Sequence, residues 1–396
     1  MKWPTAPLRK LAPPVAARCG FKPSDKVWHL SLDQIEGDTG EIIGKRYATA
    51  SEAGTSTFCF DAGNVLYSKL RPYLNKVALP DEQGIATTEL IPLRPNPATL
   101  APRFLAYYLR SPAFVNQATH HVAGAKMPRV VMDWFWEHEA PLPAPKEQSR
   151  IVELLDEADR LRRLRREADA KAARILPTLF LKMFGDPATN PKGLAKKPLG
   201  NLIKVRSGNF LPAKDMAVAG VFPVYGGNGV SGYHDSFMFE ERKIVLGRVG
   251  AYCGVVHFSA PNSWITDNAL YVSEKLEPFE DHYLIAALEQ ANLNQYAGRA
   301  GQPLISGSRI YPIEILVPPE SMQQAFSKSV ASLLELDQSR ASATTHLDQL
   351  WDVLMSRAFS GQLTTRWREA HMQELLAEMA QLARALNLPM PIEAVP

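Results

Sequence analysis

LYSKLRPYLNKVAL (residues 66–79) and VLGRVGAYCGVVHF (residues 245–258) are two stretches of one chain that share a pattern. A shift of 179 residues aligns three pairs of residues in them: Lys69 with Arg248, Tyr73 with Tyr252, and Val77 with Val256. The same shift aligns ATTEL (86–90) with ITDNA (265–269), and FLAYYL (104–109) with YLIAAL (283–288). Because a single shift holds over this whole stretch, we interpret it as an internal duplication.

Beyond these stretches the shift drifts by a few residues, as insertions in loops would cause. NQATHHVAGAKMP (116–128) then matches NQYAGRAGQPLIS (294–306), PLPAP (141–145) matches ILVPP (315–319), and PLRKL (7–11) matches PLGNL (198–202). The rest of residues 1–64 matches the second copy poorly. Each copy places short β-rich runs first, then a helix, a Gly- and Pro-rich loop, a further strand and a long helix. This order predicts an α+β globular domain followed by a helical arm, written twice.

The duplication predicts five segments along the chain. They are a first globular domain (1–146), a first helical arm (147–185), a second globular domain (186–320), a second helical arm (321–363), and a C-terminal amphipathic helix with its tail (364–396). Leu375, Leu376, Met379, Leu382 and Leu386 mark the apolar face of that last helix. This face is expected either to dock a partner or to cover its own protein.

The two arms carry apolar residues at steps of three and four, which predicts two helices paired in an antiparallel coiled coil. The seam residues are Ile151, Leu154, Leu161, Ile175 and Leu179 in the first arm, and Phe326, Leu333, Leu347 and Leu354 in the second. Polar residues such as Arg165 and Arg340 interrupt the seam, and Pro177 is expected to kink the first arm. The alternative is that each helix only completes the core of its own domain.

Composition restricts the class of protein without deciding it. The chain has 396 residues, a net charge of +3 and three cysteines without CxxC spacing, which predicts reduced thiols in a cytoplasmic protein. No stretch approaches the length and apolarity of a membrane span, so we expect no membrane partner.

Motifs for catalysis are missing where they would be expected. GNGVSG (227–232) has the letters of a dinucleotide fingerprint, but its flanks predict a turn and not a strand–turn–helix unit. His120 and His121 are adjacent and cannot both face one ion from a regular helix, so no metal site is predicted. The sequence also lacks a P-loop and a methyltransferase motif. These features favour a binding protein over an enzyme.

Basic and amide side chains recur at matched places of the two copies and suit phosphates and base edges of DNA. The candidate contacts are Lys69, Arg71, Lys76, Lys126 and Arg129 in the first copy, and Tyr225, Asn228, Arg248, Arg299, Gln302, Ser306 and Arg309 in the second.

The chain resembles the specificity subunit of type I restriction–modification systems. The resemblance rests on VLYSKLRPYLNKVAL, KIVLGRVGAYCGVV, WITDNALYV, PLPAPKEQSRIVELLDEAD, ILPTLFLKMFGDP, and ILVPPESMQQAFSKSVASLLELD with AFSGQL, and it covers residues 7–363. It implies two target-recognition domains, each reading one half of a split, asymmetric sequence in double-stranded DNA, with the arms fixing the gap.

The resemblance further implies a subunit without catalysis or cofactor of its own. It would recruit two modification (methyltransferase) subunits and the restriction (endonuclease and translocase) subunits, in which S-adenosylmethionine, ATP and Mg are expected. The recruitment would go through the helical regions, where the candidate partner-binding residues are Ile151, Leu154, Leu161, Ile175, Leu179, Phe326, Leu333, Leu347 and Leu354. The alternatives are the specificity subunit of a type II-like or orphan methyltransferase system, and a non-catalytic scaffold that binds protein or RNA.

Overall fold

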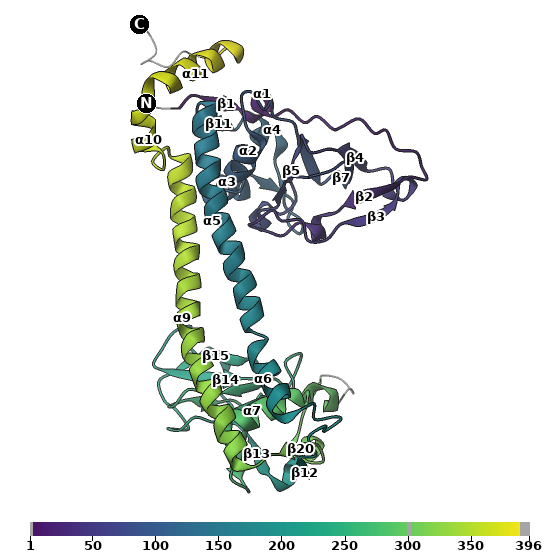
Figure 1. Cartoon of the computed structure of the whole chain (residues 1–396), viewed down its shortest axis with the longest axis vertical. Helices are drawn as coiled ribbons and strands as arrows, with labels where there is room; N and C mark the ends of the chain where they lie inside the picture. The colour runs from purple at the N-terminus through teal and green to yellow at the C-terminus, as the bar shows by residue number, and fades with distance from the viewer. Residues whose placement is uncertain (1–2, 299–302, 389–396) are drawn as a thin grey trace. The chain divides into compact units, whose positions relative to one another are not determined.

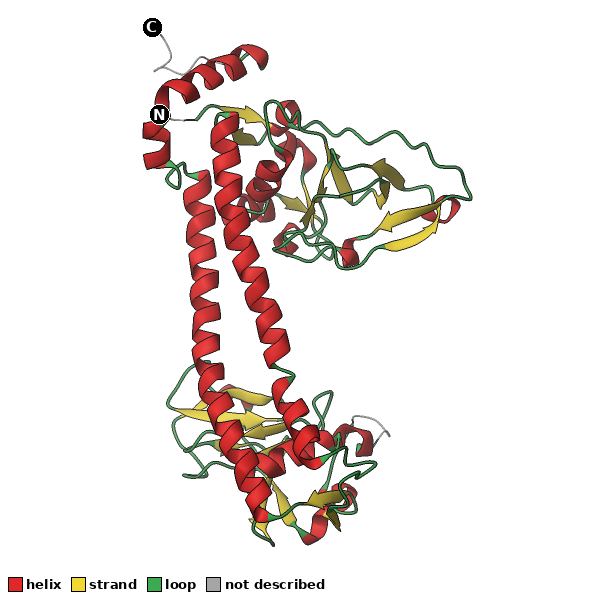
Figure 2. Ribbon diagram, in the orientation of Figure 1, coloured by secondary structure: helices red, strands yellow, loops and turns green. Residues whose placement is uncertain are grey.

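The computed structural model describes residues 3–298 and 303–388 and divides the chain into two compact units (Figure 1). Unit 1 contains Met1–Arg165 and Thr344–Pro396, and unit 2 contains Arg166–Ala343. Both units mix helices with strands (Figure 2), as the α+β prediction requires. Within the described ranges, every helix is too short or too polar to cross a membrane.

Unit 1 is built from two small sheets, helices that cover them, and parts of two long helices. Its strands are β1 (Thr5–Pro7), β2 (Lys26–Leu30), β3 (Arg46–Thr49), β4 (Thr57–Phe60), β5 (Val65–Ser68), β6 (Val77–Ala78), β7 (Gly84–Thr87), β8 (Leu90–Leu93), β9 (Val122–Ala123), β10 (Arg129–Val130) and β11 (Glu139–Pro141). Its helices are α1 (Leu8–Leu11), α2 (Pro102–Leu109), α3 (Pro112–His120), α4 (Met132–Glu137), α10 (Thr365–Ala370) and α11 (Met372–Ala385), with most of α5 (Pro145–Ala172) and the end of α9 (Glu320–Phe359). The sheets have the orders β3-β2-β7-β4 and β6-β5-β8, and β1 pairs with β11.

Unit 2 repeats this plan with fewer strands. Its strands are β12 (Ala195–Pro198), β13 (Ile203–Ser207), β14 (Phe222–Gly226), β15 (Gly229–His234), β16 (Ile244–Gly247), β17 (Val256–Phe258), β18 (Trp264–Ile265), β19 (Ala269–Lys275) and β20 (Glu314–Val317). Its helices are α6 (Ile175–Phe184), α7 (Asp281–Gln290), α8 (Gly307–Ile310), the end of α5 and the beginning of α9. The sheets have the orders β13-β19-β16-β17 and β15-β14-β18, and β12 pairs with β20.

The strand register confirms the predicted duplication residue by residue. In unit 1, Leu66 lies opposite Ala78 and Tyr67 opposite Ile91. In unit 2, the residues 179 positions later show the same pairings, Val245 with His257 and Leu246 with Leu270. Helix α2 begins at Pro102 and helix α7 begins at Asp281, which is the same shift again.

The poorly matching part of residues 1–64 also follows the common plan. Each unit contains one parallel strand pair, β2 with β7 in unit 1 and β14 with β18 in unit 2. The units differ in how the next strand is reached, because residues 31–45 join β2 to β3, whereas Gly227 and Asn228 alone join β14 to β15. The predicted turn in GNGVSG is therefore confirmed as a hairpin turn, and a long insertion explains the weak match.

The long helices pack against each other within each unit, in an antiparallel manner. In unit 1, the start of α5 (Ile151, Leu155) shares a core with the end of α9 (Met355, Ala358). In unit 2, the start of α9 (Phe326, Val330) shares a core with α6 (Phe180, Phe184). The helices therefore pair as predicted and also complete the core of each unit, so the alternative that they only complete a core is wrong.

The middle of the arms departs from the predicted apolar seam. Leu161 and Ile175 are 45% and 46% exposed, and Leu154, Leu179, Leu333, Leu347 and Leu354 are half-buried. Polar pairs join the helices there: Arg162 with Asp348 at 3.1 Å, Arg165 with Thr344 at 3.2 Å, and Arg340 with Asp169 at 2.7 Å. A shift of 175 residues maps Arg165 onto Arg340 and Asp169 onto Thr344, so the last two pairs occupy equivalent places of the duplication.

The predicted kink at Pro177 is a full break. Helix α5 ends at Ala172, and α6 begins at Ile175 with Pro177 in its first turn. A proline at this position cannot donate a hydrogen bond to the carbonyl of Ala173, and its ring collides with that carbonyl, which accounts for the interruption of the helix just before it.

Two buried glutamines anchor the long helices at equivalent positions. The Gln148 amide donates to Thr99 O and Pro143 O at 2.8 Å each, and its oxygen accepts from Ala101 N at 2.8 Å. In unit 2, Gln323 donates to Pro318 O at 3.0 Å and accepts from Glu280 N at 3.2 Å. Ala101 and Glu280 are the N-cap residues of α2 and α7, so each glutamine ties its long helix to the beginning of another helix.

A buried carboxylate holds the C-terminal segment on unit 1. Glu147 is fully buried and accepts hydrogen bonds from Trp3 Nε1 (2.8 Å), Thr364 Oγ1 (2.6 Å) and Arg368 Nε (2.7 Å). Beyond it, the apolar face of α11 is buried on unit 1, with Leu375, Met379 and Leu382 all below 5% exposed. Of the two alternatives for this helix, the structure therefore favours the one in which it covers its own protein.

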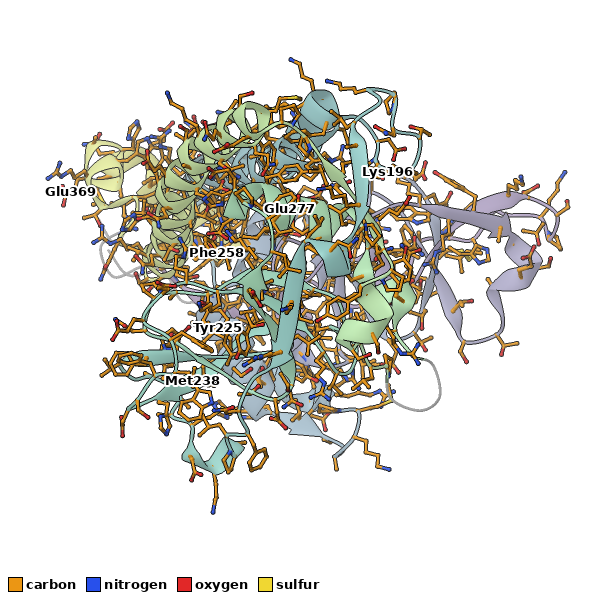
Figure 3. All side chains as sticks on the ribbon, turned by 90° about the horizontal axis from the view of Figure 1, so that it is seen from below. Lys196, Tyr225, Met238, Phe258, Glu277 and Glu369 are labelled. Carbon is orange, nitrogen blue, oxygen red and sulfur yellow. A yellow bond between two sulfur atoms is a disulfide. The ribbon has the colours of Figure 1, made fainter. Side chains whose placement is uncertain are left out.

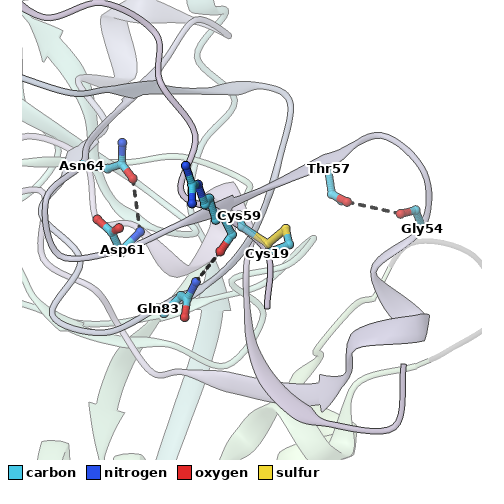
Figure 4. The surroundings of a disulfide bond; sticks show 8 residues. Cys19, Gly54, Thr57, Cys59, Asp61, Asn64 and Gln83 are labelled. Atoms are coloured by element: carbon cyan, nitrogen blue, oxygen red, sulfur yellow. Dashed lines mark hydrogen bonds between the residues drawn. A yellow bond between two sulfur atoms is a disulfide. The ribbon is translucent and has the colours of Figure 1, made fainter. Parts of the chain in front are cut away.

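The expectation of reduced thiols is wrong for two of the three cysteines. Cys19 and Cys59 form a disulfide, with 5.5 Å between their Cα atoms (Figure 4), and Cys253 remains free. The pairing arises because the segment before β2 runs alongside β4, where Ala17 N donates to Cys59 O at 2.8 Å. Residues 40 positions apart are thus brought together by the tertiary fold and not by a recognisable spacing.

Candidate nucleic-acid interface

The residues that follow β5 and β16 form two equivalent connections, which we call connection A (residues 69–76) and connection B (residues 248–255). Lys69 N in connection A donates to Glu89 O, and Arg248 N in connection B donates to Asn268 O, each at 3.0 Å. Arg71 N and Gly250 N likewise donate to Pro128 O (2.8 Å) and Pro303 O (2.9 Å). The same backbone hydrogen bonds therefore present a cation at the same place in both units.

Arg71 adopts a backbone conformation that is unusual for its residue type. Its φ is 50°, in the left-handed region, and the equivalent residue in connection B is Gly250 with φ 83°. The Arg71 Nε is buried and, within the described residues, lacks a hydrogen-bond partner. A strained arginine where glycine would fit is typical of a residue retained for its side chain.

Two exposed tyrosines lie at matched positions that the site prediction did not include. Tyr73 in connection A is 51% exposed, and Tyr252 in connection B is 52% exposed. A tyrosine beside cations can contact a phosphate of duplex DNA through its hydroxyl or a base edge in a groove through its ring. The alignment of the two copies already contained this signal, because both tyrosines lie on the 179-residue shift.

An ion pair borders connection A. Arg129 contacts Glu89 at 2.7 Å, and this hydrogen bond holds the pKa of the Glu89 carboxyl below its usual range, with Lys69 contributing a smaller electrostatic effect. The carboxylate is therefore charged at neutral pH and occupies part of the Arg129 guanidinium. Lys126, in the loop before Arg129, is exposed.

In unit 2, Arg248 is oriented by two hydrogen bonds from Nη1, to Ser207 Oγ (2.9 Å) and Asp267 O (3.1 Å). The exposed Asn228 lies in the β14–β15 turn beside connection B. The β14–β15 turn and connection B both lie against Gly247, because a Cβ on this glycine would collide with the carbonyls of Gly227 and Tyr252. The structure thus brings Asn228, Arg248 and Tyr252 into one region of unit 2.

Other predicted contacts are placed differently. Tyr225 is 9% exposed in the core of unit 2 (Figure 3), and its hydroxyl accepts from Ala260 N at 2.9 Å, which gives it a packing role. Lys76 Nζ donates to Leu32 O at 2.7 Å, and Ser306 Oγ pairs with Ser308 Oγ at 2.9 Å. Arg309 is exposed on α8, beside a cavity. Arg299 and Gln302 lie outside the described residues.

Within residues 3–298 and 303–388, no three His, Cys, Asp or Glu side chains are grouped as ligands of a metal ion. Around connections A and B the described side chains include cations, amides and tyrosines, which suit a polyanion, together with the Glu89 carboxylate that pairs with Arg129.

Comparison with known proteins agrees with this chemistry. The family model of the type I restriction modification DNA specificity domain matches residues 47–171 and again residues 191–339. Two specificity subunits of Escherichia coli type I restriction enzymes are similar: EcoprrI (28% identity over 127 residues, 31% of each chain) and EcoDI (26% over 162 residues, 39% of this chain and 35% of the relative). These matches span about a third of each relative's length. The MjaIX specificity subunit of Methanocaldococcus jannaschii matches with 23% identity over 65% of this chain and 68% of its own.

Solved structures show the same fold. One belongs to a study of complex assembly and conformational transition of the type I R-M system, with a TM-score of 0.59, 19% identity, and coverage of 91% of this chain and 98% of that one. The S subunit of the type I system from M. genitalium gives a TM-score of 0.55 at 16% identity, covering 91% and 96%. With two family matches, two equivalent units and the same fold in these structures, the chain belongs to the type I restriction–modification DNA specificity family and carries the specificity domain twice.

Proposed function

We propose that this chain is the specificity subunit of a type I restriction–modification complex and binds double-stranded DNA through connections A and B. The observation that carries the proposal is the equivalence of the two connections. Lys69 and Arg248 are held by the same hydrogen bonds, and Tyr73 and Tyr252 are equally exposed. One unit would read each half of a split, asymmetric sequence, since the matched scaffolds carry different side chains.

The proposal divides the chain as the sequence predicts. Residues 1–146 and 186–320 are target-recognition domains, and residues 147–185 and 321–363 are arms that fix the gap between the half-sites. Helix α9 is continuous over 40 residues, which supports the proposal of a stiff arm.

In this proposal the reactions belong to other chains, in the cytoplasm where the DNA is found. Two modification subunits would use S-adenosylmethionine, and restriction subunits would use ATP and Mg. The name of the similar structure, which concerns assembly of a type I system, supports partners of this kind.

The test is to express the chain with its modification partner in a host without other methyltransferases and to map methylated positions across the genome. One bipartite motif is expected, with an unmethylated spacer. Replacing residues 198–310 with the matching segment of a related chain should change one half of the motif and keep the other. A methylated complex without any such motif would contradict the proposal.

Two other functions remain distinguishable. In a type II-like or orphan system the motif would be methylated without any restriction subunit in the complex. A protein- or RNA-binding scaffold would show no preference among DNA duplexes, whereas specific DNA binding weakens by roughly 1–3 kcal/mol for each wrong base pair.

A further inference from the structure

The connection between β2 and β3 folds back on itself as a small hairpin. Ile35 and Ile42 pair across this hairpin. Ile35 is 1% exposed and belongs to the core that also contains Trp28, so the base of the hairpin is fixed on unit 1. The tip of the hairpin, residues 37–40, is therefore held in a defined place.

This tip lies against connection A. A Cβ on Gly37 would collide with the carbonyl of Leu74, so the two backbones are in contact. Asp38 N donates to Asn75 O at 3.1 Å, and Asn75 Nδ2 donates to Asp38 Oδ1 at 3.1 Å. Asp38 is exposed, and within the described residues its other carboxylate oxygen, Oδ2, has no hydrogen-bond partner. An oriented carboxylate is thus held on Asn75, two positions after the exposed Tyr73.

Unit 2 presents an equivalent side chain at the same place of its fold. Strands β14 and β18 correspond to β2 and β7, so the turn after β14 corresponds to the hairpin after β2. A Cβ on Gly227 would lie 3.5 Å from Val249 O in connection B, and one on Gly229 would lie 3.2 Å from the His257 ring. Asn228 between these glycines is exposed, and in residues 3–298 and 303–388 its side chain has no hydrogen-bond partner. Each unit therefore holds one short, exposed polar side chain at a turn beside its connection.

The two side chains differ in hydrogen-bonding capacity. A carboxylate oxygen only accepts, whereas a carboxamide both accepts and donates. In the major groove, cytosine offers a single donor, its N4 amino group, and adenine offers a donor at N6 beside an acceptor at N7. Guanine and thymine offer acceptors there, which repel a carboxylate. Asp38 therefore suits cytosine, and Asn228 suits adenine.

We propose that these two turns read bases: Asp38 selects a cytosine in the half-site bound by unit 1, and Asn228 selects an adenine in the half-site bound by unit 2. The inference rests on the proposed function, since connections A and B must bring the duplex to the turns. The cations of the connections contact phosphates and position the duplex. A carboxylate repels phosphates, so Asp38 contributes the selection of a base and not overall affinity.

The test exchanges the two side chains in the intact complex with its modification partner. Asp38→Asn and Asn228→Asp keep the size of each side chain, and the amide oxygen in Asp38→Asn can still accept from Asn75 Nδ2. Asp38→Gly removes the side chain and suits the left-handed backbone at this position, where φ is 63°. Glu41→Gln is the matched control, because it removes one exposed negative charge from the same hairpin outside its tip.

Competition binding measures the preference of each variant, with duplexes that carry each of the four bases at each position of one half-site. Asp38→Asn should lose the preference for cytosine at one position by about tenfold or more and favour a base with an acceptor, because the free atom becomes an N–H donor. Asn228→Asp should replace adenine by cytosine at one position of the other half-site. Asp38→Gly should bind all four bases about equally at its position, and Glu41→Gln should match the wild type.

Circular dichroism checks that each variant folds. Folded exchange variants that leave every base preference unchanged would overturn the inference, as would a loss of affinity that is equal for all four bases. The same conclusion would follow if Glu41→Gln altered the position that Asp38→Asn alters, since charge alone would then explain the effect. A wild-type complex that methylates no bipartite motif would instead contradict the proposed function.

Discussion

At Arg71, one substitution separates the effect of backbone strain on stability from the effect of the side chain on DNA binding. The equivalent Gly250 shows that glycine satisfies this backbone, so the variant Arg71→Gly should relieve about 1–2 kcal/mol of strain and leave unit 1 at least as stable. If the guanidinium contacts phosphate, DNA affinity should fall and the slope of log K against log salt should decrease by about one. Thermal unfolding and binding titrations at several salt concentrations measure both.

Arg9→Ala is the control for this variant, since Arg9 pairs with Glu137 and its replacement removes the same charge elsewhere in unit 1. Its salt slope should equal that of the wild type. An Arg71→Gly protein with an unchanged slope would remove Arg71 from the interface.

The cysteine pair gives a second prediction at this scale. A bond that closes a loop of 40 residues should stabilise unit 1 by about 2–4 kcal/mol, so a reductant should lower its free energy of unfolding by that amount. Chemical unfolding with and without reductant measures the difference. In Cys19→Ser the exposed partner is removed, and the reductant should then have no effect. Equal stability of the oxidised and reduced wild-type protein would contradict the prediction.

The sequence predicted the place of some residues in the fold and could not predict that of others. Lys69 and Arg248 could be matched from the sequence alone, because the same offset of 179 residues aligns them and their neighbours. Tyr225 could not be recognised as a core residue, since its burial depends on strands that pair only in the folded unit. The partner of Cys19 was equally hidden, because no spacing rule relates residues whose proximity arises from a loop beside a strand.

At the scale of elements, Gln148 and Gln323 decide how firmly each long helix is attached. Gln148→Leu would leave the Ala101 N–H and the carbonyls of Thr99 and Pro143 without their partner. Each such group that stays buried should destabilise unit 1 by about 1–3 kcal/mol. Gln323→Leu should affect unit 2 in the same way. Limited proteolysis with mass analysis of the fragments reports which unit opens.

Ser149→Ala is the matched control, since its exposed hydroxyl bonds only within α5. It should leave the proteolysis pattern of both units unchanged. If Gln148→Leu opened unit 2 before unit 1, this glutamine would not be the anchor of α5 in unit 1.

The sequence predicted the arms but not how their middle is held. Heptad spacing identifies apolar residues that can meet, and it succeeded at Ile151 and Phe326, where an arm enters a domain core. It failed at Leu161, which is 45% exposed, whereas the neighbouring Arg162 pairs with Asp348 of the other helix. A pattern of apolar residues carries no information on which charged side chains will pair across two helices.

At the scale of the whole molecule, the duplication predicts that damage to one unit affects one half of the DNA target. Tyr73→Ala and Tyr252→Ala should each weaken binding to duplex DNA by about 1.5–3 kcal/mol, if the hydroxyl donates a hydrogen bond to a phosphate. Each variant should relax sequence preference in a different half of the motif. Binding to duplexes randomised in one half at a time makes the comparison.

Tyr73→Phe and Tyr252→Phe keep the ring and separate a contact of the ring with a base edge from a contact of the hydroxyl with phosphate. Retained affinity in the phenylalanine variants favours the contact of the ring. If both alanine variants relaxed the same half, the assignment of one unit to each half-site would be wrong.

Glu147 accepts hydrogen bonds from Trp3, Thr364 and Arg368, so the N-terminal part of unit 1 depends on residues that are synthesised last. This affects the order in which the two units fold during translation. The core of unit 1 also includes Met355 and Ala358, so the domain translated first lacks part of its interior until the last stretch of the chain emerges. Unit 2 is continuous from residue 166 to residue 343 and has its whole core beforehand. We therefore expect the second-made domain to fold first, with the first-made one waiting, partly open, for the end of synthesis.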